Sequence, residues 1–294
     1  MRDIDFRTLA PTTTNTRFGP VEYAEFGKGP VVLTLHGAMG GYDQSLLLAR
    51  TIGDTGFRYI GVSRPGYLGT PLSSGKTSAQ QADLCAELLN TLGIESAIIM
   101  AVSGGGPCAL QFAMRHKQRC RGLVLVSTCG GKMDTKIPFS FNLTKLLVRC
   151  PAIANAMQRK AMTNIEQAAS RSIPDPVLRT HTLNDPVIGP LFTELLSSTC
   201  DRMGQRIHGT ENDIAITRST DYPLESISVP TLIVHGTADQ VVPYIQHAKA
   251  LASRISGAKL VTAEGADHVA IFTHNQELKP QVVQFLHTQS SLAR

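Results

Sequence analysis

The strongest indication of the fold is the segment Ile99-Met100-Ala101-Val102-Ser103-Gly104-Gly105-Gly106-Pro107. Apolar residues run directly into a serine, and three glycines and a proline precede a helix-forming run that ends near Arg115. Proline is tolerated in the first turn of a helix, because its missing N–H would have no partner there. The pattern therefore predicts a buried strand, a sharp turn that presents the hydroxyl of Ser103, and a helix from Gly106.

Similar apolar runs recur along the chain and predict the other strands of one sheet. The seven runs are Val21–Phe26, Val31–Leu35, Arg58–Val62, Ala97–Val102, Leu123–Val126, Thr231–Val234 and Lys259–Thr262. Runs that are apolar on both faces are typical of parallel strands covered by helices on both sides. Helical patterns fill the gaps, at Gln44–Thr55, Ser78–Leu92 with Ser78 as N-cap, Gly106–Arg115, Tyr244–Arg254 and Pro280–Thr288. This alternation predicts a doubly wound α/β fold with a mostly parallel sheet.

The alternation breaks between about Lys132 and Tyr222, where no convincing strand occurs. Helical stretches at 141–149, 153–170 and 190–206 are separated by prolines. We predict that residues 1–131 and 223–294 form the two parts of an α/β core, and that residues 132–222 form an inserted helical cap, or lid. Insertions beyond the carboxyl ends of the strands are where ligands bind in such sheets.

Composition indicates an ordinary globular protein, because 42% of the 294 residues are hydrophobic and 17% are charged. The net charge of +5 is dispersed, and the densest basic group, Arg115–Arg121, lies at a predicted helix end, so nucleic-acid binding is not indicated. Six cysteines occur singly and are interpreted as small buried hydrophobic residues. The first 30 residues have no signal-peptide pattern, and no apolar run reaches the roughly 18 residues of a membrane helix. A cytoplasmic protein that binds neither membrane nor nucleic acid, as a monomer or homodimer, is expected.

A serine hydroxyl is a poor nucleophile at neutral pH, and it needs a base and a carboxylate that orients the base. Asp239 follows the predicted strand Thr231–Val234 by a few residues, and His268 follows the last predicted strand in the same way. The carboxyl ends of parallel strands meet at one edge of a sheet, so Ser103, Asp239 and His268 are expected to lie together. Their order along the chain is that of a serine triad on this type of sheet.

These segments resemble the α/β-hydrolase superfamily over nearly the whole chain outside the insertion. The resemblance implies an eight-stranded sheet, with Ser103 as nucleophile, Asp239 as acid and His268 as base. His36-Gly37 resembles the oxyanion-hole loop of the family, which implies that the backbone N–H groups of Ala38 and Gly104 bind the oxyanion. The loop Ser63-Arg64-Pro65-Gly66-Tyr67 resembles a stretch that these proteins often carry, and a structural role is expected for it.

Several features leave alternatives open. The family pattern G-x-S-x-G has alanine at its first position here, Ala101, whose methyl group is the smallest possible intrusion into the turn. Asp239 could instead bond only its own turn, Asp134 is a rival acid after the preceding core strand, and Asp267 could serve with awkward geometry. His36 is expected to brace its loop. The remaining histidines, such as His181, His208, His247 and His274, show no metal-ligand spacing.

The constellation predicts acyl transfer, in which a small-molecule ester is cleaved through an acyl-enzyme without a metal or organic cofactor. A carboxylesterase for esters of small or medium apolar acids is the main hypothesis. Apolar residues of the insertion could line the pocket: Phe139, Phe141, Leu143, Leu146, Met157, Met162, Leu191, Phe192 and Leu195. Glu166 and Glu194 could hold a substrate amine, although solvated faces are the simpler interpretation.

Three other functions fit the same residues. One is a carbon–carbon bond hydrolase, although its relatives often carry an aromatic residue after the catalytic histidine, where this chain has Val269. Another is a cofactor-free perhydrolase. The third is a ligand-binding protein with an idle triad, because a fold and a triad do not guarantee turnover.

Overall fold

The computed structural model describes residues 9–133, 139–148 and 150–291. Eight strands form one sheet in the order β1-β2-β4-β3-β5-β6-β7-β8. Their bounds are Thr12–Thr16 (β1), Gly19–Gly27 (β2), Val31–Leu35 (β3), Arg58–Val62 (β4), Ala97–Val102 (β5), Cys120–Val126 (β6), Thr231–Gly236 (β7) and Lys259–Ala263 (β8). β1 and β2 pair antiparallel, and every pair from β4 to β8 is parallel. The carboxyl ends of six strands therefore meet at one edge.

Helices cover both faces of the sheet, because successive side chains of a strand point to opposite sides. Ile99 and Ala101 of β5 pack on the side of α2 (Ser78–Thr91), α3 (Gly106–Arg115) and α10 (Ala248–Arg254). Ile98 and Met100 pack on the other side, against a cluster that includes α1 (Tyr42–Ile52) and α12 (Asn275–Ser291). These strand residues are almost completely buried. The two apolar layers fix the sheet as a rigid platform for the loops at its edge.

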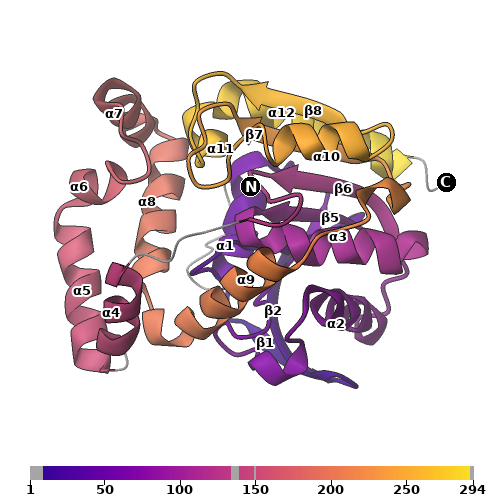
Figure 1. The fold of residues 1–294 in the computed structure, drawn as a ribbon, viewed down its shortest axis with the longest axis horizontal. Coiled ribbons are helices and arrows are strands. Elements are labelled where there is room, and N and C mark those ends of the chain that lie inside the picture. Colours follow the sequence, from indigo (N-terminus) through magenta and orange to yellow (C-terminus); the bar gives the residue numbers. More distant parts are fainter. Residues whose placement is uncertain (1–8, 134–138, 149, 292–294) are drawn as a thin grey trace.

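Between β6 and β7 the described residues form helices joined by loops, without a strand. The α-helices are α4 (Phe139–Leu147), α5 (Pro151–Thr163), α6 (Ile165–Ala169), α7 (Pro176–Asn184), α8 (Ile188–Cys200) and α9 (Ile207–Ser219). Figure 1 shows α4 to α8 gathered at one end of the molecule, on the left, while α9 leads back across the core. We call α4–α9 the helical insertion. No described helix is both long and apolar enough to cross a membrane.

The structure confirms all seven strands that the apolar runs predict, with small shifts at their ends. β1 was not predicted, because its sequence TTTNT is polar and the strand lies half exposed at the sheet edge. The N-cap of α2 is Thr77, not Ser78, and Thr77 forms a capping box with Gln80. The last helix begins at Asn275 and continues through Pro280. Four of the six cysteines are buried, and none forms a disulfide.

Candidate active site

Ser103 lies at the turn between β5 and α3, as the sequence predicts. Its φ of 50° is in the left-handed region, which a non-glycine residue adopts only where the surrounding structure enforces it. A Cβ atom at Gly105 would lie 2.7 Å from the carbonyl oxygen of Leu35, so only glycine lets the turn approach β3 this closely. Ala101 is fully buried and paired in the sheet, so its methyl group is accommodated without loss of the turn.

Ser103, His268 and Asp239 come together at the carboxyl edge of the sheet, after β5, β8 and β7. The Ser103 Oγ lies 3.0 Å from Nε2 of His268, and Nδ1 of the same ring lies 2.8 Å from Oδ2 of Asp239. An ionised carboxylate only accepts hydrogen bonds, so Nδ1 carries the imidazole proton and Nε2 is free to accept from the serine hydroxyl. The chain of contacts can move a proton from Ser103 to His268.

The two oxygens of Asp239 have different partners. Oδ1 accepts from the backbone N–H groups of Val241 and Val242, both at 2.8 Å, while Oδ2 faces His268. Asp239 therefore bonds its own turn and also orients the imidazole. Burial alone would raise the pKa of Asp239, but hydrogen bonds from His235 and His268 outweigh burial and hold this pKa well below its usual range. The carboxylate is thus ionised at neutral pH.

Of the two rival acids, only Asp267 lies in the described structure, and it does not take the place of Asp239. Oδ1 of Asp267 accepts from the backbone N–H groups of Gln240 and His268, at 3.2 and 2.7 Å, so it is engaged by the backbone and not by the imidazole of His268. Asp134 lies outside the described residues. Among the residues that are described, no group of three His, Cys, Asp or Glu side chains is arranged to hold a metal ion.

The loop after β3 passes directly beside the serine. A Cβ at Gly37 would lie 2.9 Å from the Cβ of Ser103, and a Cβ at Gly104 would lie 3.5 Å from the backbone nitrogen of Ala38. The peptide groups at Ala38 and Gly104 are therefore neighbours next to the hydroxyl. Two backbone N–H groups converging near a nucleophile are the arrangement that can stabilise a developing oxyanion.

Arg64 braces this loop from behind. Its Nε donates to the carbonyl oxygen of His36 at 3.0 Å, and its backbone N–H donates to Nε2 of His36, also at 3.0 Å. Nδ1 of His36 lies 2.6 Å from the carbonyl oxygen of Gly37, which makes the ring a neutral bridge within the loop. Burial and the charge of Arg64 hold the pKa of His36 well below its usual range. These contacts agree with the structural role expected for both residues.

The guanidinium of Arg64 also forms a buried ion pair with Asp213 of α9. Nη1 and Nη2 reach the two carboxylate oxygens at 2.8 and 2.5 Å, and Oη of Tyr67 donates to Oδ2 at 2.6 Å. The side chains of Arg64 and Asp213 are only 1% and 7% exposed. No sequence signal points to Asp213, because no local pattern connects two residues that are 149 positions apart. The pair fastens the helical insertion to the loop at Gly37.

A cavity of about 420 Å³ opens on Ser103 and His268. Its walls are mostly apolar and come from α1, α8 and the segment of α11 (Ala270–Thr273): Leu47, Leu48, Leu195, Leu196, Ile271 and Phe272. Nε2 of Gln44 donates to the hydroxyl groups of Ser198 and Thr199, both at 3.1 Å, and thereby links α1 to α8 at the wall. The arrangement can hold an apolar group beside the hydroxyl while most of that group is shielded from water.

Most of the insertion residues that were predicted to line this pocket pack elsewhere or are exposed. Of the nine, Leu195 lines the cavity. Leu191 and Phe192 belong to the core cluster, Met157 packs in a small cluster with Val148, Ala154 and Ile207, and Leu143 and Leu146 are exposed. The side chains of Phe139, Phe141 and Met162 lie outside the described residues. Glu194 pairs with Arg50 at 2.6 Å and Glu166 lies 3.7 Å from Arg179, and neither lines the cavity.

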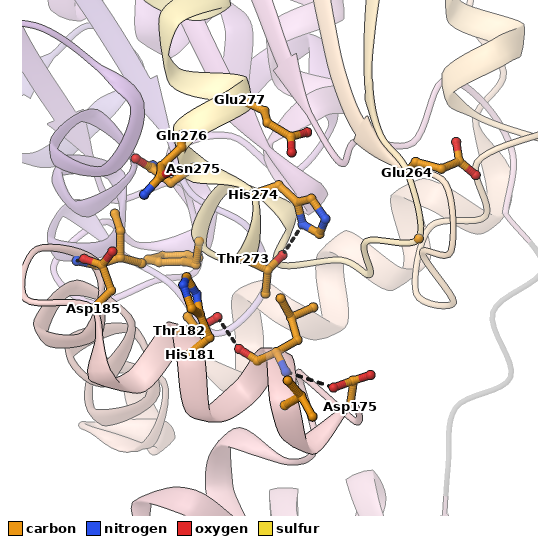
Figure 2. Close-up of a pocket in the computed structure, with 15 residues that line it drawn as sticks. Asp175, His181, Thr182, Asp185, Glu264, Thr273, His274, Asn275, Gln276 and Glu277 are labelled. Carbon is orange, nitrogen blue, oxygen red and sulfur yellow. Dashed lines mark hydrogen bonds between the residues drawn. The ribbon is translucent and has the colours of Figure 1, made fainter.

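A second, more open cleft of about 600 Å³ lies between α7 and the segment from α11 into α12 (Figure 2). Phe272 lines both this cleft and the cavity at Ser103. The carboxylates of Asp175 and Asp185 are engaged by backbone N–H groups near the start of α7 and α8. The cleft contains neither Ser103 nor His268, so its size does not make it the reactive site.

Comparisons with known proteins place the chain in a family. Residues 30–275 match the family described as alpha/beta hydrolase fold. A solved alpha/beta hydrolase fold protein from Nakamurella multipartita is 31% identical, with a TM-score of 0.85 over 96% of this chain and 100% of that one. An uncharacterized hydrolase of Bacillus subtilis, YcgS, is 27% identical over 85% of this chain and 89% of its own.

A third relative has a more specific name. The 2-hydroxy-6-oxononadienedioate/2-hydroxy-6-oxononatrienedioate hydrolase of Klebsiella pneumoniae is 26% identical over 88% of each chain. The sheet topology, the serine at the strand-to-helix turn and the extent of the family match all agree. The chain therefore belongs to the α/β hydrolase fold family and is a hydrolase of that family.

Proposed function

We propose that the protein is a serine hydrolase that cleaves carboxylic esters of small or medium apolar acids through an acyl-enzyme. The observation that carries the proposal is the chain Ser103–His268–Asp239 beside an apolar cavity. Ser103 attacks the ester carbonyl while His268 accepts its proton, and Asp239 stabilises the imidazolium that forms. The backbone N–H groups of Ala38 and Gly104 bind the oxyanion, and water then releases the acid with His268 as base. Loss of one such donor typically lowers kcat by about 10²–10³-fold.

The cavity supports the preference for an apolar acyl or alcohol group. An apolar ligand group that packs against its leucine, isoleucine and phenylalanine side chains removes apolar surface from water, and this burial favours binding. A volume of about 420 Å³ sets an upper limit on the group that fits beside Ser103. We propose residues 132–222 as a cap domain, because α8 supplies part of the cavity wall while the core supplies the triad.

The first test is covalent labelling combined with an ester panel. A fluorophosphonate is expected to modify the purified protein once per chain, and peptide mapping is expected to locate the adduct at Ser103. Hydrolysis of p-nitrophenyl esters is expected to rise with acyl length and then fall when the acyl group exceeds the cavity. A protein that resists the phosphonate and hydrolyses no ester in the panel would instead be a ligand-binding protein with an idle triad.

A second candidate is a hydrolase of substrates that carry a carboxylate, including carbon–carbon bond cleavage. Arg171 is the one permanently charged side chain among the described residues that line the cavity. No carboxylate pairs with it in the described part of the chain. Burial raises the pKa of Cys200, which lines the same wall, and the charge of Arg171 opposes that rise. The guanidinium of Arg171 is therefore near enough to Cys200 to act on the cavity wall. The named dienedioate hydrolase relative supports testing this class.

Substrates that differ only in charge can test Arg171. The Arg171→Gln variant is expected to lose up to about fivefold in kcat/KM for a hemiester of a dicarboxylic acid, because a partly solvated ion pair contributes up to ~1 kcal/mol. The neutral diester of the same acid is expected to be unaffected, and Arg171→Lys is expected to keep most of the preference. An equal change for both substrates would show that Arg171 does not select charge. A dienoate substrate, assayed in parallel, separates carbon–carbon cleavage from ester cleavage.

A further inference from the structure

His235 makes a second imidazole contact with the carboxylate of Asp239. The residue is the next to last of β7, and its side chain is completely buried. Its Nε2 lies 2.8 Å from the carbonyl oxygen of Val242 and 3.2 Å from Oδ2 of Asp239. Both partners are acceptors, so Nε2 must carry a proton. Nδ1 is buried without a hydrogen-bond partner among the described residues, which makes it the bare nitrogen of a neutral ring.

Oδ2 of Asp239 thus lies close to two imidazole nitrogens, Nδ1 of His268 at 2.8 Å and Nε2 of His235 at 3.2 Å, and the latter directs its N–H mainly at the carbonyl oxygen of Val242. We propose that His235 is a positioning residue of the hydrolase proposed above: it shares this carboxylate oxygen with His268 and sets how strongly Asp239 holds the catalytic imidazole. The inference rests on the proposed function, because only a reacting triad makes that strength matter.

The geometry gives His235 two effects on Asp239. First, Oδ1 accepts from the backbone of Val241 and Val242 while His235 lies against Oδ2, so both contacts keep Oδ2 directed at His268. Val242 both donates to Asp239 and accepts from His235, which closes the turn on itself. Second, the N–H of His235 takes up part of the negative charge on Oδ2. Without it, the whole charge of that oxygen would act on His268.

The other titratable groups around His235 do not supply this contact. The ring of Tyr244 lies 6.1 Å from the ring of His235, and His247 faces His235 from the segment before α10. Burial and His235 lower the pKa of His247, whose Nδ1 lies 3.3 Å from the backbone nitrogen of Gly130. Asp267 accepts from the backbone N–H groups of Gln240 and His268. His235 is the side chain that shares Oδ2 with His268.

Two substitutions separate positioning from simple packing. His235→Phe keeps the ring and removes the donor, so kcat/KM for an ester is expected to fall by about tenfold, the equivalent of one lost charged hydrogen bond. The acid-side midpoint of the kcat/KM profile is expected to move up by about 0.5 to 1 pH unit, because Asp239 then stabilises the imidazolium more strongly. His235→Gln restores a donor and is expected to return the midpoint most of the way.

His247→Phe is the matched control, because it removes a neighbouring buried histidine that does not bond Asp239. Its acid-side midpoint is expected to equal that of the unaltered protein. A folded His235→Phe variant with an unchanged midpoint would overturn the inference, even in a protein whose Ser103 is labelled and active. Failure of the proposed function would give a different result, because Ser103 of the unaltered protein would then not be labelled by the fluorophosphonate.

NMR of the unaltered protein tests the same point without a variant that must fold. With ¹⁵N-labelled histidine, the ring of His235 is expected to carry its proton on Nε2, the nitrogen that faces Val242 and Asp239. An Nδ1–H tautomer would overturn the inference, because Nε2 would then have no proton to direct at Asp239.

Discussion

Replacement of Ser103 by alanine is expected to lower kcat/KM for every ester in the panel by roughly 10⁴–10⁶-fold. The Oγ of Ser103 is the atom that would form the acyl-enzyme, and it is the hydroxyl oxygen that Nε2 of His268 contacts in the described part of the chain. The free energy of unfolding is expected to change little, because alanine keeps the same backbone at φ 50° and the removed group makes one hydrogen bond. Steady-state kinetics and chemical denaturation of the same preparation check both expectations.

Asp239→Asn provides the companion measurement and is expected to reduce turnover by about 10⁴-fold, since the amide cannot stabilise an imidazolium in the same way. Asp134→Asn is the matched control, because Asp134 is the rival acid and lies outside the described residues. Its activity is expected to remain that of the unaltered protein. The opposite pattern would assign the acid to Asp134. Activity that survives Ser103→Ala would exclude a Ser103 acyl-enzyme.

Replacement of Arg64 by methionine is expected to destabilise the fold by about 3–5 kcal/mol, because it leaves the carboxylate of Asp213 buried without its ionic partner. Burial alone would lower the pKa of the Arg64 guanidinium. The charge and hydrogen bonds of Asp213 outweigh burial and raise this pKa, so the pair is ionised in the folded protein. Ester turnover is expected to fall as well, because Arg64 holds the carbonyl of His36 next to Gly37. Urea denaturation measures the free energy of unfolding.

A double-mutant cycle isolates the ion pair from its surroundings. Arg64→Met combined with Asp213→Leu is expected to be more stable than Arg64→Met alone, because the second change removes the unpaired charge. The same cycle in kcat separates the stability of the pair from its effect on the loop at Gly37. Additive losses in the cycle would mean that the two side chains act independently, against the contacts of 2.8 and 2.5 Å.

Much of the core fold could be predicted because its signals are local. A strand that is buried on both faces must be apolar throughout, as in Ile99–Val102, and a helix that covers it needs an apolar stripe, as in α2. β1 was not predicted, because a half-exposed edge strand of threonine and asparagine does not need to be apolar. α9 was not predicted for a related reason. The face that it buries includes the polar side chains Thr210, Asn212 and Asp213, so its sequence lacks the spacing of apolar residues that indicates a helix.

The placement of the candidate triad was predictable for a topological reason. Parallel strands end at the same edge, so residues after β5, β7 and β8 meet whatever their separation in the chain. The cavity wall was not predictable in this way, because helix packing in the insertion decides which face of each helix meets the core. Leu195 faces the cavity, for example, whereas Leu146 is 61% exposed. His235 and Asp213 act through partners that only the folded chain brings near.

The ion pair between Arg64 and Asp213 has a practical consequence for protein engineers who transplant helical segments between relatives to change selectivity. α9 carries the aspartate that compensates an arginine of the core, so exchange of α4–α9 as one block would leave that arginine unpaired wherever the donor segment lacks a matching carboxylate. A chimera joined between Cys200 and Ile207 would keep α9, and with it the ion pair between Arg64 and Asp213, in the recipient protein. The helix α8, which lines part of the cavity, would come from the donor.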